Sequence, residues 1–137
     1  MGLILDSSII IAAERRVQPV SDLLRQVRTT AGGTGIRLSA ISVIELCHGI
    51  WRADTPERRA GRRLYLEELF SAIAVEPFTK EMGERAARID AAVRQGGKVV
   101  PFADLQIGAT ALELGYEVMT DNLRHFELIP DLIVRRL

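Results

Sequence analysis

The sequence has almost no cysteine and no long hydrophobic run. The single cysteine, Cys47, cannot form an internal disulfide, so a reducing compartment is the simplest expectation. No apolar segment approaches the length that crosses a bilayer, and the N-terminus lacks a signal-peptide pattern. We therefore expect a cytoplasmic protein that does not associate with membranes.

The sequence also lacks an excess of charge of either sign. It carries 18 basic and 18 acidic residues, so no global electrostatic attraction draws it toward nucleic acid or a membrane surface. Lysine is nearly absent, with only Lys80 and Lys98, and the other basic residues are arginines. Arginine suits bidentate phosphate contacts, but a GC-rich genome produces the same bias. The basic composition alone therefore does not indicate a partner.

The length and composition are those of one globular domain over residues 1–137, since 47% of the residues are hydrophobic and 26% are charged. Short apolar segments typical of buried strands alternate with helical patterns. The predicted strands are 3–5, 36–41, 73–75, 116–119 and a short edge strand at 132–134. This alternation predicts a three-layer α/β/α domain with a mostly parallel sheet of four or five strands.

Helix boundaries are indicated by capping residues and glycines. Thr55 followed by Pro56 is typical of an N-cap and first helical position, Thr79 caps another helix, and Gly115 fits a helix C-cap. The predicted helices are 9–16, 21–30, 43–53, 56–70, one that starts after Thr79 and ends at 96–97, and one in the segment that follows Pro101.

The segment 101–126 places an acid on the packing side of its helix. At helical period Asp104 points roughly opposite Gln106, Thr110 and Glu113. A carboxylate on the buried side of a helix is costly unless an arginine, hydrogen-bond donors or a metal ion compensates it. We therefore expect a specific partner for Asp104.

Several acids follow the predicted strands. Asp6 comes directly after the first strand, Glu45 lies in the first turn after the second, and Asp121 and Asn122 follow the fourth. The carboxyl ends of parallel strands form the ligand-binding edge of an open α/β sheet. Asp104 joins this group only if its helix begins at the same edge. Because that helix runs antiparallel to the following strand, the sequence leaves its edge open.

Each acid also has a simple structural explanation. Asp6 fits the N-cap of the first helix, and Ser42 with Glu45 matches a capping box. Asp104 fits a pairing with Arg88 or a favourable interaction with the helix dipole. Asp121 and Asn122 are ordinary turn residues, so the functional case depends on the group.

The basic residues around the fourth predicted helix have two interpretations. They could form a patch that faces RNA, or they could simply form a solvated helix face, which is the simpler interpretation. These residues are Arg52, Arg58, Arg59, Arg62 and Arg63.

A cluster of carboxylates is typical of a site for a hard divalent cation. Mg²⁺ and Mn²⁺ prefer oxygen ligands, and such a site suits phosphodiester hydrolysis. Zinc is not indicated, because Cys47 and His48 are a lone adjacent pair.

Four segments in order along the chain resemble the PIN-domain ribonucleases, and among them the VapC-like toxins of bacterial toxin–antitoxin pairs. The resemblance covers essentially the whole chain. The segments are LILDSS at 3–8, ISVIEL at 41–46 with Gly49, DLQIGATA at 104–111, and MTDNLRHF at 119–126.

The resemblance implies a Mg²⁺- or Mn²⁺-dependent endoribonuclease that acts on RNA. Asp6, Glu45 and Asp104 match the family's acidic positions, as catalytic residues and metal ligands. The fourth position, acidic in many members, falls on Asn122, which weakens the case for a second metal site, and the neighbouring Asp121 is an alternative ligand.

Supporting roles and partners follow from the same resemblance. Ser7 and Thr120 are expected to support the substrate phosphate, and Arg124 to contact the RNA backbone. The family also implies a homodimer and inhibition by a cognate antitoxin protein.

Two other classes of protein remain open at this stage. A phosphoacceptor signalling domain also gathers acids and Mg²⁺ at strand ends, but it needs a lysine on a late strand, and Lys80 and Lys98 both precede the fourth strand. A non-catalytic binding module is disfavoured by the intact Asp6, Glu45 and Asp104, whereas Asn122 keeps it open.

Overall fold

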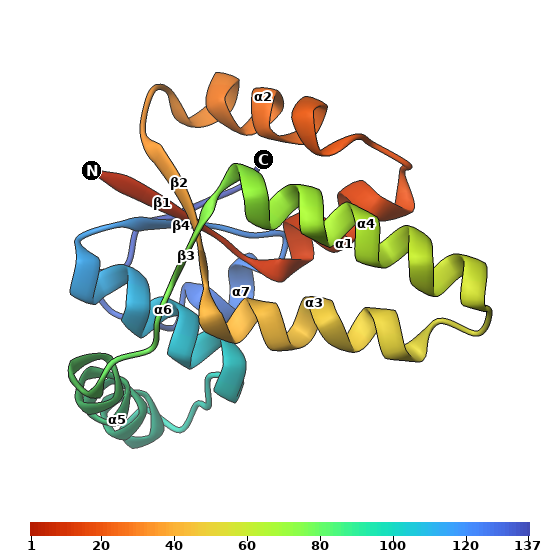
Figure 1. Cartoon of the computed structure of the whole chain (residues 1–137). Helices are drawn as coiled ribbons and strands as arrows, with labels where there is room; N and C mark the ends of the chain where they lie inside the picture. Colours follow the sequence, from red (N-terminus) through yellow and green to blue (C-terminus); the bar gives the residue numbers. More distant parts are fainter.

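Five parallel strands form the centre of the molecule in the computed structural model, which describes residues 1–137 (Figure 1). The strand order is β3-β2-β1-β4-β5, so β1 lies in the middle between β2 and β4. The strands are β1 (Gly2–Leu5), β2 (Gly35–Ser39), β3 (Ala74–Glu76), β4 (Glu117–Met119) and β5 (Val134–Arg135). The predicted parallel sheet is thus confirmed, with five strands.

Seven helices connect the strands and cover the sheet. They are α1 (Ser7–Arg15), α2 (Val20–Ala31), α3 (Ala40–Arg52), α4 (Pro56–Ala72), α5 (Lys80–Gln95), α6 (Phe102–Leu114) and α7 (Leu123–Phe126). The expected caps are present: the Thr55 side chain accepts from the Arg58 amide, and the Thr79 side chain accepts from the Met82 amide. Gly115 ends α6 in the left-handed conformation, at φ 71°.

The two faces of the sheet carry separate cores, as alternation along a strand requires. Leu3 and Leu5 of β1 pack with residues of α1 to α4, whereas Ile4 packs with residues of α5, α6 and α7. All three side chains are buried, so the central strand is covered on both sides. Figure 1 shows α2 and α4 on one side of the sheet and α5 and α6 on the other, which is the predicted three-layer arrangement. No helix is both long enough and apolar enough to span a membrane.

The second strand ends two residues earlier than the sequence predicts. Ser39 closes β2 and caps α3, accepting a hydrogen bond from the Ile41 amide at 3.1 Å. The apolar side chains of residues 40 and 41 continue the strand pattern, but the Ser39 hydroxyl starts the helix at residue 40. Glu45 consequently lies in the second turn of α3, not in the first.

The direction of α6 decides which edge Asp104 occupies. Helix α6 joins β4 through Gly115 and Tyr116 and runs antiparallel to it, so the helix begins where the strand ends. The N-terminus of α6 therefore lies at the carboxyl edge of the sheet. Asp104 therefore joins the other acids at this edge, which the sequence had left open.

Candidate active site

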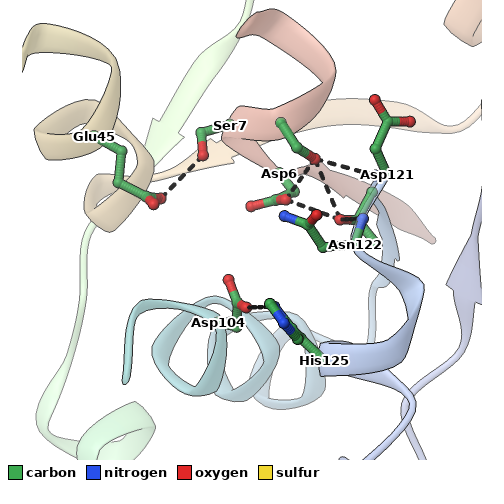
Figure 2. Close-up of polar contacts among 9 residues, drawn as sticks. Asp6, Ser7, Glu45, Asp104, Asp121, Asn122 and His125 are labelled. Atoms are coloured by element: carbon green, nitrogen blue, oxygen red, sulfur yellow. Dashed lines mark hydrogen bonds and ion pairs between the residues drawn. The ribbon is translucent and has the colours of Figure 1, made fainter. Parts of the chain in front are cut away.

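Asp6 is held by two hydroxyl groups at the end of the central strand. Its Oδ2 accepts from Ser8 Oγ at 2.7 Å and from Thr120 Oγ1 at 2.8 Å (Figure 2). Asp6 occupies the N-cap position of α1, but its side chain makes no capping hydrogen bond. With 2% of its surface exposed, Asp6 is a buried carboxylate oriented by contacts across the sheet edge, and the capping interpretation does not account for it.

Glu45 reaches the same region from α3. Its Oε1 accepts from Ser7 Oγ at 3.1 Å, which connects α3 to the first residue of α1. The capping-box interpretation was wrong, since Ser39 is the cap and the Ser42 hydroxyl is buried without a partner. Ser7 therefore orients the Glu45 carboxylate. The sequence had predicted a contact of Ser7 with substrate phosphate and not this role.

Asp104 lies in the first turn of α6 with 7% of its surface exposed. Its Oδ2 is 2.7 Å from Nδ1 of His125, and no contact with Arg88 forms. A carboxylate only accepts, so an ionised Asp104 places the imidazole proton on Nδ1. The expected partner of this buried acid exists, and it is a histidine of α7.

The turn between β4 and α7 contributes mainly through Thr120. The Thr120 hydroxyl accepts from the Asn122 amide at 2.8 Å while it donates to Asp6. The backbone amide of Asp121 donates a hydrogen bond to Ser8 Oγ at 3.1 Å. The Asp121 carboxylate points away from Asp104 (Figure 2). Asp121, Asn122 and Arg124 are all exposed.

The three acids lie within electrostatic range of one another. Burial raises the pKa of Glu45, and the negative charges of Asp6 and Asp104 raise it further, while the Ser7 hydrogen bond lowers it. Burial likewise raises the pKa of Asp104, and Asp6 adds to this effect, while His125 opposes it. Because no arginine or lysine offsets the cluster, the three carboxylates repel one another and would be stabilised by a cation.

Each acid uses one oxygen for hydrogen bonds and leaves the other free. Asp6 Oδ1, Glu45 Oε2 and Asp104 Oδ1 have no protein partner, and Ser42 Oγ is the only unpartnered side-chain polar atom that is buried. The three free oxygens are therefore accessible to solvent. Figure 2 shows Asp6, Glu45 and Asp104 converging on one region from the N-cap of α1, from α3 and from α6.

The donor set has the chemistry for a hard divalent cation but is not a preformed three-ligand cage. Carboxylate oxygens are suitable ligands for Mg²⁺ or Mn²⁺. As the side chains stand, no three His, Cys, Asp or Glu residues are close enough together to hold one ion. A bound cation would have to draw the acids closer, and Glu45 is the least buried of the three.

Sequence reasoning missed two residues that hold the acids. Ser8 and His125 were quoted as parts of motifs without a role. His125 follows Asn122 at helical spacing directly after a strand, and Ser8 is a second hydroxyl after Asp6, so both signals were present in the sequence. Ser8 holds Asp6, only two residues away, whereas the partner of His125 is Asp104, 21 residues earlier in the chain.

A model of the family described as PIN domain matches residues 3–131 of the chain. The chain is 31% identical to "Ribonuclease VapC" of Rickettsia bellii over 136 residues, which cover 98% of this chain and 95% of the relative. It is 27% identical to "Ribonuclease VapC2" of Haemophilus influenzae over 125 residues, which cover 91% of this chain and 89% of the relative.

Solved structures share the fold. The crystal structure of VapBC2 from Rickettsia felis, bound to a DNA fragment from its promoter, contains a chain with a TM-score of 0.86 and 21% identity, covering 100% of this chain and 99% of that one. The structure of DNA-bound VapBC from Salmonella typhimurium contains a chain with a TM-score of 0.83 and 24% identity. The match covers 99% of this chain and 98% of that one.

Proposed function

Because the chain belongs to the PIN domain family, among the VapC ribonucleases, we propose that it is an endoribonuclease that hydrolyses RNA phosphodiester bonds with Mg²⁺ or Mn²⁺. One observation carries this proposal: Asp6, Glu45 and Asp104 each present a free, solvent-accessible oxygen at one edge of the sheet. Burial raises the pKa values of Glu45 and Asp104, and the charge of Asp6 raises both further; a bound divalent cation would offset both effects.

The cation would be held by Asp6 and Asp104, with Glu45 completing the ligand set or orienting the attacking water. When bound, the cation polarises the phosphoryl group, lowers the pKa of the attacking water and stabilises the leaving oxygen. The chain's own residues fix the acids: Thr120 and Ser8 hold Asp6, Ser7 holds Glu45, and His125 holds Asp104. In the reaction water attacks phosphorus, the ester P–O bond breaks, and the leaving oxygen takes up a proton.

The neutral amide of Asn122 favours a site that binds only one ion firmly. An amide oxygen carries no formal charge, so it attracts a cation less than the carboxylate found in many family members. Asp121 remains the alternative ligand in this turn, and Arg124 on α7 is free to contact the RNA backbone. Thr120 orients Asp6 and Ser7 orients Glu45, so both hydroxyls would affect the substrate only through these carboxylates.

The biological role that fits this activity is the toxin of a toxin–antitoxin pair. The structural relatives include VapBC complexes, and a cognate antitoxin that covers the acidic site is the partner we propose. We also propose a homodimer and, because its substrate is RNA, a cytoplasmic site of action. The phosphoacceptor alternative is set aside, because Lys80 begins α5 and Lys98 follows it, so neither lies on a strand.

RNA cleavage with and without chelator tests the proposal. Purified protein incubated with total RNA is expected to produce discrete fragments in Mg²⁺ or Mn²⁺ and none in EDTA. Asp6→Asn keeps the size of the side chain while removing its charge, so it should remain folded and inactive. Cleavage that persists in EDTA, or in folded Asp6→Asn, would rule out the metal-dependent mechanism.

A further inference from the structure

A groove leads away from the acids between α1, α3 and α4. It has a volume of about 870 Å³, and Glu45 forms part of its wall. Glu45, Gly49 and Arg52 lie at positions i, i+4 and i+7 of α3 and therefore share one face of that helix. The groove thus extends along α3 from a catalytic acid to Arg52, about 10 Å at 1.5 Å per residue.

The walls of the groove carry more positive than negative charge. Four arginines line it, Arg15, Arg52, Arg58 and Arg62, against the two acids Glu14 and Glu45. Arg58 is paired with Asp54, and Arg62 donates to the backbone oxygen of Gly49.

Arg15 and Arg52 form no hydrogen bond or ion pair and are exposed. Two uncommitted guanidinium groups therefore line the same groove as Glu45, in a chain whose net charge is zero. A solvated helix face is the simpler interpretation of this region, and the experiment below decides between the two.

We propose that this groove is a binding subsite for one flank of an RNA strand, and that Arg15 and Arg52 bind its phosphates. The proposal rests on the proposed ribonuclease function. The three carboxylates repel the phosphates of an RNA strand, and the arginines farther along the groove supply positive charge for its flank. Guanidinium groups bind phosphate oxygens in bidentate fashion, which suits Arg15 and Arg52.

Gly61 supplies a second, independent feature of the groove. It lies within α4, where glycine disfavours the helix, and a side chain added there would meet no atom within 4 Å. Gly61 is one of the residues that line the groove. Gly61→Leu would therefore add an apolar side chain to the groove wall without removing a charge.

The test measures binding of a short fluorescein-labelled single-stranded RNA by anisotropy in EDTA, so that cleavage does not interfere. The variant Arg15→Ala/Arg52→Ala is expected to weaken binding about tenfold. It should also lower the slope of log K against log salt by about 1.4, which corresponds to two lost phosphate contacts on a single strand. Gly61→Leu should weaken binding while its melting temperature stays the same or rises.

The matched control is Arg25→Ala/Arg28→Ala, which removes the same charge from a separate depression between α2 and α4. It should leave both the affinity and the salt slope unchanged. Equal losses in both double variants would mean general charge attraction, and no loss in either would mean no subsite; each result overturns the proposal. If an oligoglutamate peptide binds in an Arg15- and Arg52-dependent manner and RNA does not, the groove is a peptide site and the proposal fails.

Cleavage assays separate this proposal from the function it rests on. If the wild type cleaves RNA and the Arg15→Ala/Arg52→Ala variant shows a raised KM with unchanged kcat, both are supported. If the wild type cleaves RNA and the variant matches it in KM and affinity, only the subsite fails. If the wild type binds RNA through the groove but never cleaves it, the subsite stands and the ribonuclease function fails.

Discussion

Nδ1 of His125 lies 2.7 Å from Oδ2 of Asp104, across 21 residues of sequence. The same short segment carries Thr120, whose hydroxyl binds Asp6 Oδ2 at 2.8 Å. The turn that follows β4 therefore orients two of the three acids at once. Its position next to the central strand makes this possible, because β4 pairs with β1 up to Leu5, the residue before Asp6.

His125→Ala should reduce RNA cleavage about tenfold and weaken Mn²⁺ binding, because partners that orient metal ligands are commonly worth 10–100-fold. His125→Asn should retain much of both, since the Asn amide reaches about as far as Nδ1. Stability should change little, because the His125 side chain is 48% exposed. Calorimetric Mn²⁺ titrations beside cleavage rates provide the measurement, and an alanine variant equal to wild type in both would show that the contact has no role.

Thr120→Val should destabilise the protein by about 1.5–3 kcal/mol, the usual value of a hydrogen bond to a charged group. Thr120 is fully buried, so water cannot replace its bonds to Asp6 and the Asn122 amide. Thr120→Ser keeps the hydroxyl and is the matched control. Urea unfolding measures the difference, and equal midpoints for Val and Ser would contradict the assigned bonds.

Ser42→Ala should leave stability unchanged or raise it by about 1 kcal/mol, since a buried hydroxyl without a partner carries a desolvation cost. Ser39→Ala should destabilise by about 1 kcal/mol, because Ser39 is the residue that caps α3. Thermal melts of the two variants test the corrected start of this helix. Loss of stability in Ser42→Ala but not in Ser39→Ala would restore the capping role predicted for Ser42.

Tyr65 should make the protein less stable between about pH 10 and pH 12. Burial, together with the nearby negative charges of Glu14 and Glu68, raises the pKa of Tyr65 to about 12. The unfolded chain loses this proton near pH 10, so the contribution to stability is complete below pH 10 and is lost as the pH rises toward 12. Tyr65→Phe should remove this part of the pH dependence, measured by urea unfolding from pH 9 to 12; identical profiles for the two proteins would contradict the raised pKa.

The fold and the positions of Asp6 and Glu45 were predictable because strand ends can be read from the sequence, whereas the edge at which Asp104 lies was left open. Asp6 follows an apolar run, and parallel strands bring their carboxyl ends to one edge. The start of α3 was not predictable, since Ala40 and Ile41 suit a strand as well as a helix and the choice depends on the Ser39 hydroxyl. His125 was missed because its role arises from a contact with Asp104, 21 residues earlier, which leaves no local pattern.

The central claim is that Asp6 and Asp104, with Glu45, jointly hold a divalent cation. Anomalous diffraction from crystals soaked in Mn²⁺ tests it most directly. We expect one strong peak in contact with carboxylate oxygens of both Asp6 and Asp104, absent from Asp104→Asn crystals treated in the same way. A peak that contacts only one of these acids, one that persists in the Asp104→Asn crystals, or none at a saturating Mn²⁺ concentration would contradict the claim.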